Sequence, residues 1–215
     1  TSEMSLGTVA VIVASYGDRE YWDKLADRAL SSVRSQSRPP EEVIRIHHPD
    51  SLQKARNTGA AQATTEWLIF LDADDELHFR YVEEMLAGRG DLRQPAVTNI
   101  ATNGNETRPY LLPMGPLIQQ NFLVIGTMIR REQFLRIGGF DDYPVLEDWA
   151  LWIKAWIDGA VIGSVPGALY RIHLRPGSRN HQYHLHRPVQ EDVRKRFLPR
   201  IPENRKTHRR HVRRR

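Results

Sequence analysis

Three carboxylates stand within four residues, directly after an apolar run. Residues 67–71 read Trp-Leu-Ile-Phe-Leu, which predicts a buried strand, and Asp72, Asp74 and Asp75 follow where that strand would end. Carboxylates this close together repel one another unless a cation lies among them, and oxygen ligands suit Mg²⁺ or Mn²⁺. Such an ion commonly binds one or two carboxylates together with substrate phosphates. The same residues could instead form an acidic turn, with Asp74 or Asp75 capping a helix that begins near Leu77.

Strand and helix patterns alternate in the segment that leads to these acids. Apolar runs predict strands at residues 9–14, 42–46 and 67–71, and apolar residues at helical spacing predict helices at 25–33 and 55–61. This alternation is typical of an α/β fold with a mostly parallel, Rossmann-like central sheet flanked by helices. Ligands of such sheets bind beyond the carboxyl ends of the strands. We therefore expect the turn after the first strand to lie beside the acidic cluster.

The second half of the chain has weaker patterns. We expect loops and one or two short strands, such as 96–100, between residues 88 and 116, and further elements around them. These are helices at 79–87, 132–137 and 149–156, and strands at 123–129, 160–165 and 168–172.

Charge is distributed unevenly along the 215 residues. Residues 194–215 carry eleven Lys or Arg and one acid, so the net charge of +5 for the whole chain leaves about −5 on residues 1–193. We expect one domain, residues 1–193, followed by a flexible basic tail. The tail could bind an anionic membrane, or an acidic partner, or simply be solvated. Because no apolar run approaches 18 residues and no signal peptide is visible, we expect a cytoplasmic protein that could bind peripherally to a membrane.

Six segments, in their order along the chain, resemble the motifs of family 2 glycosyltransferases, which have the GT-A fold. They are Val-Ile-Val-Ala-Ser-Tyr (11–16), Ala-Arg-Asn-Thr-Gly (55–59), Phe-Leu-Asp-Ala-Asp-Asp (70–75), Gly-Gly-Phe-Asp (138–141), Glu-Asp-Trp (147–149), and Tyr-Arg-Ile-His (170–173) with Gly-Ser (177–178). The resemblance covers residues 9–179. It implies a GT-A catalytic domain that transfers one sugar, with inversion, from a nucleoside-diphosphate sugar to a hydroxyl acceptor. A UDP-sugar is the favoured donor, and the acceptor is a glycan, a lipid-linked group or a protein.

The resemblance also implies which residues hold the metal and which one acts as the base. Asp74 would bind Mn²⁺ or Mg²⁺, with His173 as a further ligand, and Asp72 would bind the ribose or a metal-bound water. Asp148 would be the general base, with the adjacent Glu147 orienting it or capping the helix. The structural alternative is that both acids only favour the N-terminal turn of that helix.

The remaining motif residues would bind the nucleotide and the substrate. Tyr16 offers a ring to stack on the base, next to Ser15, and Arg56 offers a positive charge to the diphosphate. Gly139 would allow close approach of the backbone, although a glycine after a short helix also serves as a stop signal. One departure concerns the nucleobase: the acidic turn that members carry after the second strand is replaced by His-His-Pro-Asp-Ser (47–51), with Asp50 the nearest acid.

Other functional classes share some of these features. A haloacid-dehalogenase-like phosphohydrolase also has an Asp-x-Asp motif, but after its first strand, whereas Asp72 follows the third predicted strand. A nucleotidylyltransferase requires a Gly-rich phosphate loop after the first strand, and residues 15–18 are Ser-Tyr-Gly-Asp. A non-enzymatic protein could bind nucleic acid through the tail, which we consider the weaker interpretation. Turnover of a sugar nucleotide would distinguish a glycosyltransferase from these three alternatives.

Overall fold

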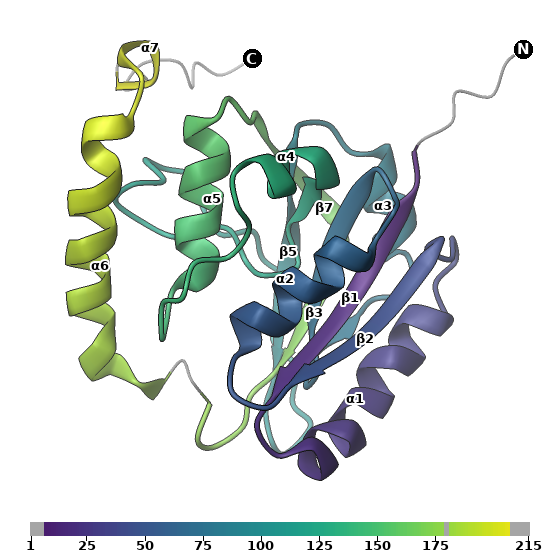
Figure 1. Ribbon diagram of the computed structural model, residues 1–215. Coiled ribbons are helices and arrows are strands. Elements are labelled where there is room, and N and C mark those ends of the chain that lie inside the picture. The colour runs from purple at the N-terminus through teal and green to yellow at the C-terminus, as the bar shows by residue number, and fades with distance from the viewer. Residues whose placement is uncertain (1–6, 179–180, 207–215) are drawn as a thin grey trace, which may run out of the picture.

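A seven-stranded sheet forms the centre of the molecule. The computed structural model describes residues 7–178 and 181–206, and within them the strand order is β2-β1-β3-β6-β5-β7-β4 (Figure 1). The pairs β1/β2, β1/β3 and β5/β7 are parallel and long, whereas β3/β6, β5/β6 and β4/β7 are antiparallel and pair only two residues each. The predicted mixed α/β domain with a mostly parallel sheet and flanking helices is therefore confirmed.

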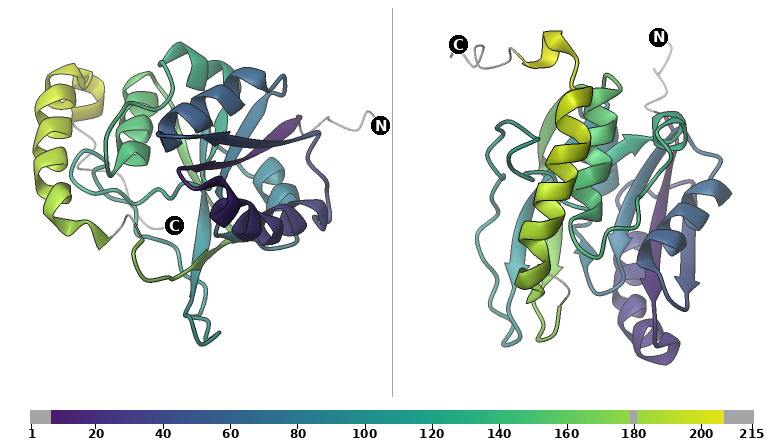
Figure 2. Two further views of the ribbon diagram at one scale, coloured as in Figure 1. Left: turned by 60° about the horizontal axis from the view of Figure 1, so that its bottom comes forward. Right: turned by 60° about the vertical axis from the view of Figure 1, so that its left-hand side comes forward.

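The N-terminal half is a β-α-β-α-β unit, as the sequence predicts. Its elements are β1 Val9–Tyr16, α1 Arg19–Arg34, β2 Glu42–His48, α2 Leu52–Gln62 and β3 Trp67–Asp72. Helices α1 and α2 lie on opposite sides of β1 and β2 (Figure 2, left), which explains why β1 is apolar on both faces. Helix α2 packs closely on β1 because Gly59 has no side chain. A Cβ at this position would stand only 2.7 Å from Ile12 Cγ2. Ser51 caps the start of α2, because its side chain accepts a hydrogen bond from the Lys54 amide.

The second half completes the sheet and adds helices on its flanks. Its elements are β4 Glu76–Leu77, α3 Tyr81–Ala87, β5 Leu92–Ile100, β6 Met128–Arg130, α4 Arg131–Arg136, α5 Glu147–Ile157 and β7 Ile162–His173. Strand β5 pairs in parallel with β7, and the short β6 joins this half to β3. The acidic residues after β3 therefore lie at the junction between the two halves of the sheet.

Three sequence predictions about elements need correction. The strand expected over residues 123–129 is reduced to β6, because most of that segment is loop. The two strands expected at 160–165 and 168–172 are one strand, β7, with a register shift opposite Pro95 and Ala96, where proline cannot donate to the ladder. The helix expected near Leu77 begins at Tyr81, since Glu76 and Leu77 pair with β7.

The boundary of the expected basic tail falls inside a helix. Helix α6 Tyr183–Phe197 is followed by η2 Leu198–Arg200 and α7 Glu203–Lys206, and α6 packs beside α5 (Figures 1 and 2). Val189, Val193 and Phe197 recur every four residues and are buried. The boundary that we expect at residue 194 thus lies within α6, whose apolar stripe packs on the core as far as Phe197. The flexibility of the basic tail stays a prediction. Residues 207–215 lie outside the described residues.

Candidate active site

A cavity of about 540 Å³ opens at the carboxyl ends of β1 and β3. Most of the residues that the sequence singles out line it: Ser15, Tyr16, Arg56, Asp72, Asp74, Glu147 and Asp148. Gly139 and His173 are not part of its lining. The acidic cluster and Asp148, 74 residues apart in sequence from Asp74, thus face one shared space.

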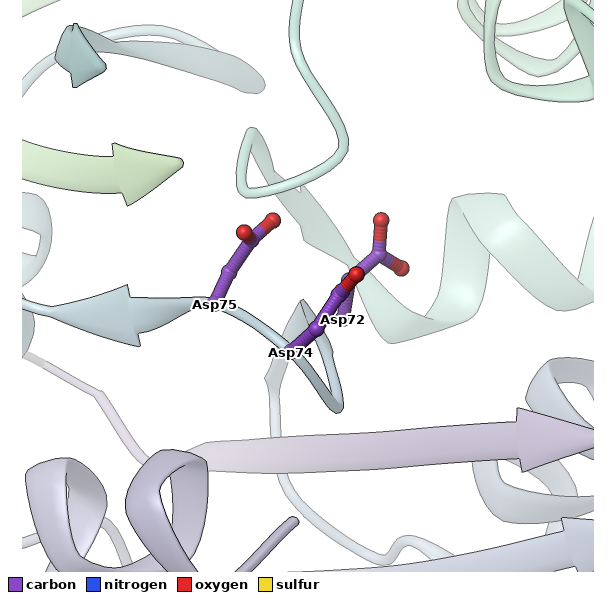
Figure 3. A group of neighbouring side chains, drawn as sticks. All are labelled: Asp72, Asp74 and Asp75. Atoms are coloured by element: carbon purple, nitrogen blue, oxygen red, sulfur yellow. The ribbon is translucent and has the colours of Figure 1, made fainter. Parts of the chain in front are cut away.

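The three acids after β3 form one cluster at the turn that leads to β4. Each of Asp72, Asp74 and Asp75 offers a carboxylate oxygen, and these oxygens lie within 4.8 Å of one another (Figure 3). Asp75 is held in place, because its Oδ2 accepts a hydrogen bond from Tyr170 Oη at 3.0 Å and its Oδ1 accepts one from the His173 amide at 2.9 Å. Burial, and then the neighbouring carboxylates, raise the pKa of Asp75 well above its usual range and raise that of Asp74. This oxygen-rich set fits a hard divalent cation.

His173 contacts this cluster with its backbone amide, which donates to Asp75, and not with its ring. The ring Nε2 lies 2.5 Å from Glu76 Oε2, and the ring is not among the side chains that could share an ion with Asp74. The imidazole would have to leave Glu76 to ligate a metal bound at Asp74.

Arg56 connects two acidic segments across the cavity. Its Nη2 donates to Asp72 Oδ1 at 2.6 Å, and its Nη1 donates to Glu147 Oε1 at 2.7 Å. The guanidinium is 3 % exposed and lies 5.1 Å from the centre of the Phe140 ring. Burial alone would lower the pKa of Arg56, but the two carboxylates outweigh it and raise that pKa. The predicted diphosphate residue therefore ties the end of β3 to the start of α5.

Asp148 occupies a desolvated position in the cavity wall at the start of α5. The preceding Leu146 has φ 59° and ψ 23°, a left-handed conformation that is strained for a residue with a branched side chain, and it turns the chain into the helix. Asn121 Nδ2 donates to Asp148 Oδ1 at 3.4 Å. Burial, and then the charge of Glu147, raise the pKa of Asp148 to about 7, although Arg56 partly opposes this. A carboxyl group with such a pKa can accept a proton near neutral pH.

Gly139 belongs to a loop that Asn57 of α2 holds by two hydrogen bonds. Asn57 Nδ2 donates to the Phe140 carbonyl at 3.0 Å, and the Phe140 amide donates to Asn57 Oδ1 at 2.8 Å. Lys154 Nζ donates to the Gly139 carbonyl at 2.5 Å. Gly139 has φ +66°, and a Cβ there would stand 2.5 Å from Asn57 Oδ1. In this structure the glycine permits close packing against Asn57.

Two histidines stand in the sequence where the acidic turn is expected, and they lie behind the β1 end of the cavity without lining it. Ser15 Oγ lies 2.9 Å from His47 Nδ1, and His48 Nδ1 accepts hydrogen bonds from the amides of Asp50 and Ser51 at 3.0 Å each. Asp50 is exposed and is not part of the cavity lining. Asn121 and Arg175 are among the lining residues that received no role from the sequence. Asn121 lies in a loop without a pattern, and Arg175 lies between the motif that ends at His173 and the Gly-Ser pair.

Comparison with known proteins agrees with this geometry. The family described as Glycosyl transferase family 2 matches residues 11–143. N-acetylgalactosaminyltransferase 6 of Drosophila melanogaster is 26 % identical over 204 residues, which cover 80 % of this chain and 30 % of that protein. The crystal structure of S. aureus TarS has a TM-score of 0.61 at 17 % identity, covering 90 % of this chain and 43 % of TarS. TarS 1–349 in complex with UDP-GlcNAc has a TM-score of 0.64 at 16 % identity, covering 90 % and 72 %.

These matches support different conclusions: the solved structures support the fold, and the family match supports the family. The structural neighbours share the fold of this chain, and the chain spans less than half the length of the fly enzyme and of TarS. The family match extends over more than half of the chain and includes the first strand, the Asp72–Asp75 turn and the Gly-Gly-Phe-Asp loop. The chain belongs to glycosyl transferase family 2.

Proposed function

We propose that this domain transfers a single sugar from a nucleoside-diphosphate sugar, most simply a UDP-sugar, to a hydroxyl acceptor with inversion of the anomeric centre. The observation that supports this proposal best is the shared cavity: Asp74 and Asp148 both line it, and burial gives Asp148 a pKa of about 7. The family relationship and the structural neighbours that bind UDP-GlcNAc and UDP favour the same donor class.

The donor would bind across the carboxyl edge of β1 and β3. Asp74, with Asp72 and Asp75, would hold a Mn²⁺ or Mg²⁺ ion, which when bound neutralises charge on the leaving diphosphate. Ser15 and Tyr16 line the same end of the cavity and would contact the nucleoside. Arg56 would act through the acids that it pairs with, because both of its terminal nitrogens already donate to carboxylates.

The acceptor would meet Asp148 on the facing wall. In its ionised form Asp148 would remove the proton from the attacking hydroxyl, while Asn121 holds one carboxylate oxygen and leaves the other for the acceptor. Attack from this side, opposite a leaving diphosphate at the acidic cluster, inverts the anomeric centre. Glu147 keeps its own carboxylate on Arg56, and its charge helps to maintain the raised pKa of Asp148.

The acceptor and the cellular setting stay predictions. A glycan, a lipid-linked group and a protein all carry the hydroxyl that the reaction needs. None of the helices in the described residues has both the length and the apolar character needed to cross a membrane. A cytoplasmic location, and an anionic membrane or acidic partner for residues 194–215, are untested expectations from the sequence.

A panel of sugar nucleotides tests the proposal. Thermal unfolding of the chain would be followed with UDP-, GDP- and dTDP-sugars, with and without Mn²⁺, and release of the nucleoside diphosphate would be measured alongside. We expect one UDP-sugar to raise the melting temperature only with Mn²⁺ and to be turned over, and Asp74→Asn to abolish both effects. Asp142→Asn, a change at an exposed acid, is the matched control. Phosphate release from simple phosphoesters, without sugar-nucleotide turnover, would instead support the phosphohydrolase alternative.

A further inference from the structure

Arg175 occupies the wall of the cavity and takes up one oxygen of the acidic cluster. Its Nε donates to Asp74 Oδ2 at 2.5 Å, and the two side chains are 25 % and 16 % exposed. The guanidinium carbon lies 4.7 Å from the centre of the Trp22 ring, and Nη1 donates to Tyr21 Oη at 3.3 Å. Two aromatic residues of α1 thus hold a cation against the residue proposed to bind the metal.

The cation balances a carboxylate that is otherwise poorly placed. The carboxylate of Asp74 lies close to those of Asp72 and Asp75, and Arg175 places a positive charge directly on its Oδ2. A carboxylate oxygen that is paired with a guanidinium is less available to a divalent ion, so Arg175 and the metal compete for Asp74.

We propose that Arg175 is a binding residue for the diphosphate of the donor and that it leaves Asp74 for the phosphate oxygens when the donor binds. This inference rests on the proposed function. A guanidinium presents a planar pair of donors that matches phosphate oxygens, and it is more weakly hydrated than an ammonium group. The stacking on Trp22 keeps the guanidinium at the cavity wall during the exchange, so the exchange needs a movement of the side chain alone.

The exchange couples metal and donor binding. Without a donor, Arg175 holds Asp74 and weakens metal binding. With a donor, the diphosphate draws Arg175 away, which releases the Asp74 oxygen. Metal and nucleoside diphosphate should therefore bind with positive cooperativity, and the side chain of Arg175 should be the source of part of that coupling.

Two binding measurements on Arg175→Met test this proposal. Electron paramagnetic resonance of free Mn²⁺, titrated in the absence of nucleotide, should show tighter Mn²⁺ binding to the variant than to the unaltered chain. Calorimetric titration with UDP in the presence of Mn²⁺ should show binding weakened by about 10- to 100-fold, as expected for loss of a charged hydrogen-bonded contact. Titration with uridine, which has no phosphate, should give the same affinity for both.

Control variants separate this role from a structural one. Arg175→Lys should recover only part of the UDP affinity, and Trp22→Leu should weaken UDP binding without weakening uridine binding. Arg136→Met breaks an ion pair with Asp158 that is not part of the cavity lining and should change neither titration. Unaltered UDP affinity in Arg175→Met, or equal losses for UDP and uridine, would overturn the inference. If the unaltered chain itself failed to bind UDP, the proposed function would fail instead.

Discussion

Arg56 Nη1 lies 2.7 Å from Oε1 of Glu147, the residue next to the proposed base. The same guanidinium donates to Asp72, so one buried arginine joins the donor side and the acceptor side of the cavity. One guanidinium thus pairs with two carboxylates that come from different elements of the fold.

Replacement of Arg56 should therefore destabilise the fold strongly. Arg56→Met removes the guanidinium that pairs with the largely buried carboxylate of Glu147, and we expect a loss of about 3 kcal/mol in the free energy of unfolding, measured in urea. The double variant Arg56→Met/Glu147→Gln should lose less, because it removes the buried negative charge as well. Equal or greater loss in the double variant would contradict this explanation.

The charge of Glu147, in addition to burial, should raise the lower pH limit of activity. Asp148 must be ionised to act as a base, so kcat/KM should fall as the pH drops below about 7. Glu147→Gln removes a like charge beside Asp148 and frees Arg56 to stabilise the ionised form. The acidic limb of the pH profile should therefore move to lower pH in this variant. A limb that stays in place would show that Asp148 does not titrate there.

The raised pKa of Asp148 also predicts an effect on stability. Its pKa in the folded chain, about 7, exceeds the ordinary value of 3.8, so the folded state binds more protons between these values and loses stability as the pH rises through them. Asp148→Asn escapes this penalty. We expect the variant to be the more stable protein at pH 8, by on the order of 4 kcal/mol at most, with a difference that disappears near pH 4. Urea unfolding at several pH values measures this.

Two adjacent glycines offer a matched pair of substitutions. Gly138 and Gly139 both have positive φ, but a Cβ on Gly138 meets nothing within 4 Å, whereas one on Gly139 would strike Asn57. Gly138→Ala should cost about 1 kcal/mol of stability from backbone strain alone. Gly139→Ala should cost clearly more, and Asn57→Ala should relieve part of the excess. Similar losses for the two glycine variants would mean that the loop adjusts around Asn57.

The sequence was sufficient to predict the N-terminal unit and the place of the site. Continuous apolar strands and helical spacings are local signals, and parallel strands bring their carboxyl ends to one edge, so Ser15 and Asp72 could be placed together before the structure was known. The order of motifs added Asp148, which reaches the same cavity from the far half of the chain.

Side-chain partners could not be predicted in the same way. Arg56 has the charge expected of a diphosphate ligand, but its pairing with Glu147 depends on how α2 and α5 pack, which no local pattern records. Arg175 lies between two of the motifs and belongs to neither. The charge of residues 194–215 suggests a tail that begins at residue 194, whereas the apolar stripe of α6 continues to Phe197 and packs on the core.

Nucleotide binding and turnover in Asp148→Asn test the central claim most directly. We expect the variant to bind UDP with Mn²⁺ as tightly as the unaltered chain and to release UDP from its sugar nucleotide roughly 100- to 10,000-fold more slowly. Unchanged turnover in a variant that binds normally would contradict the assignment of Asp148 as the base that acts across the cavity from Asp74.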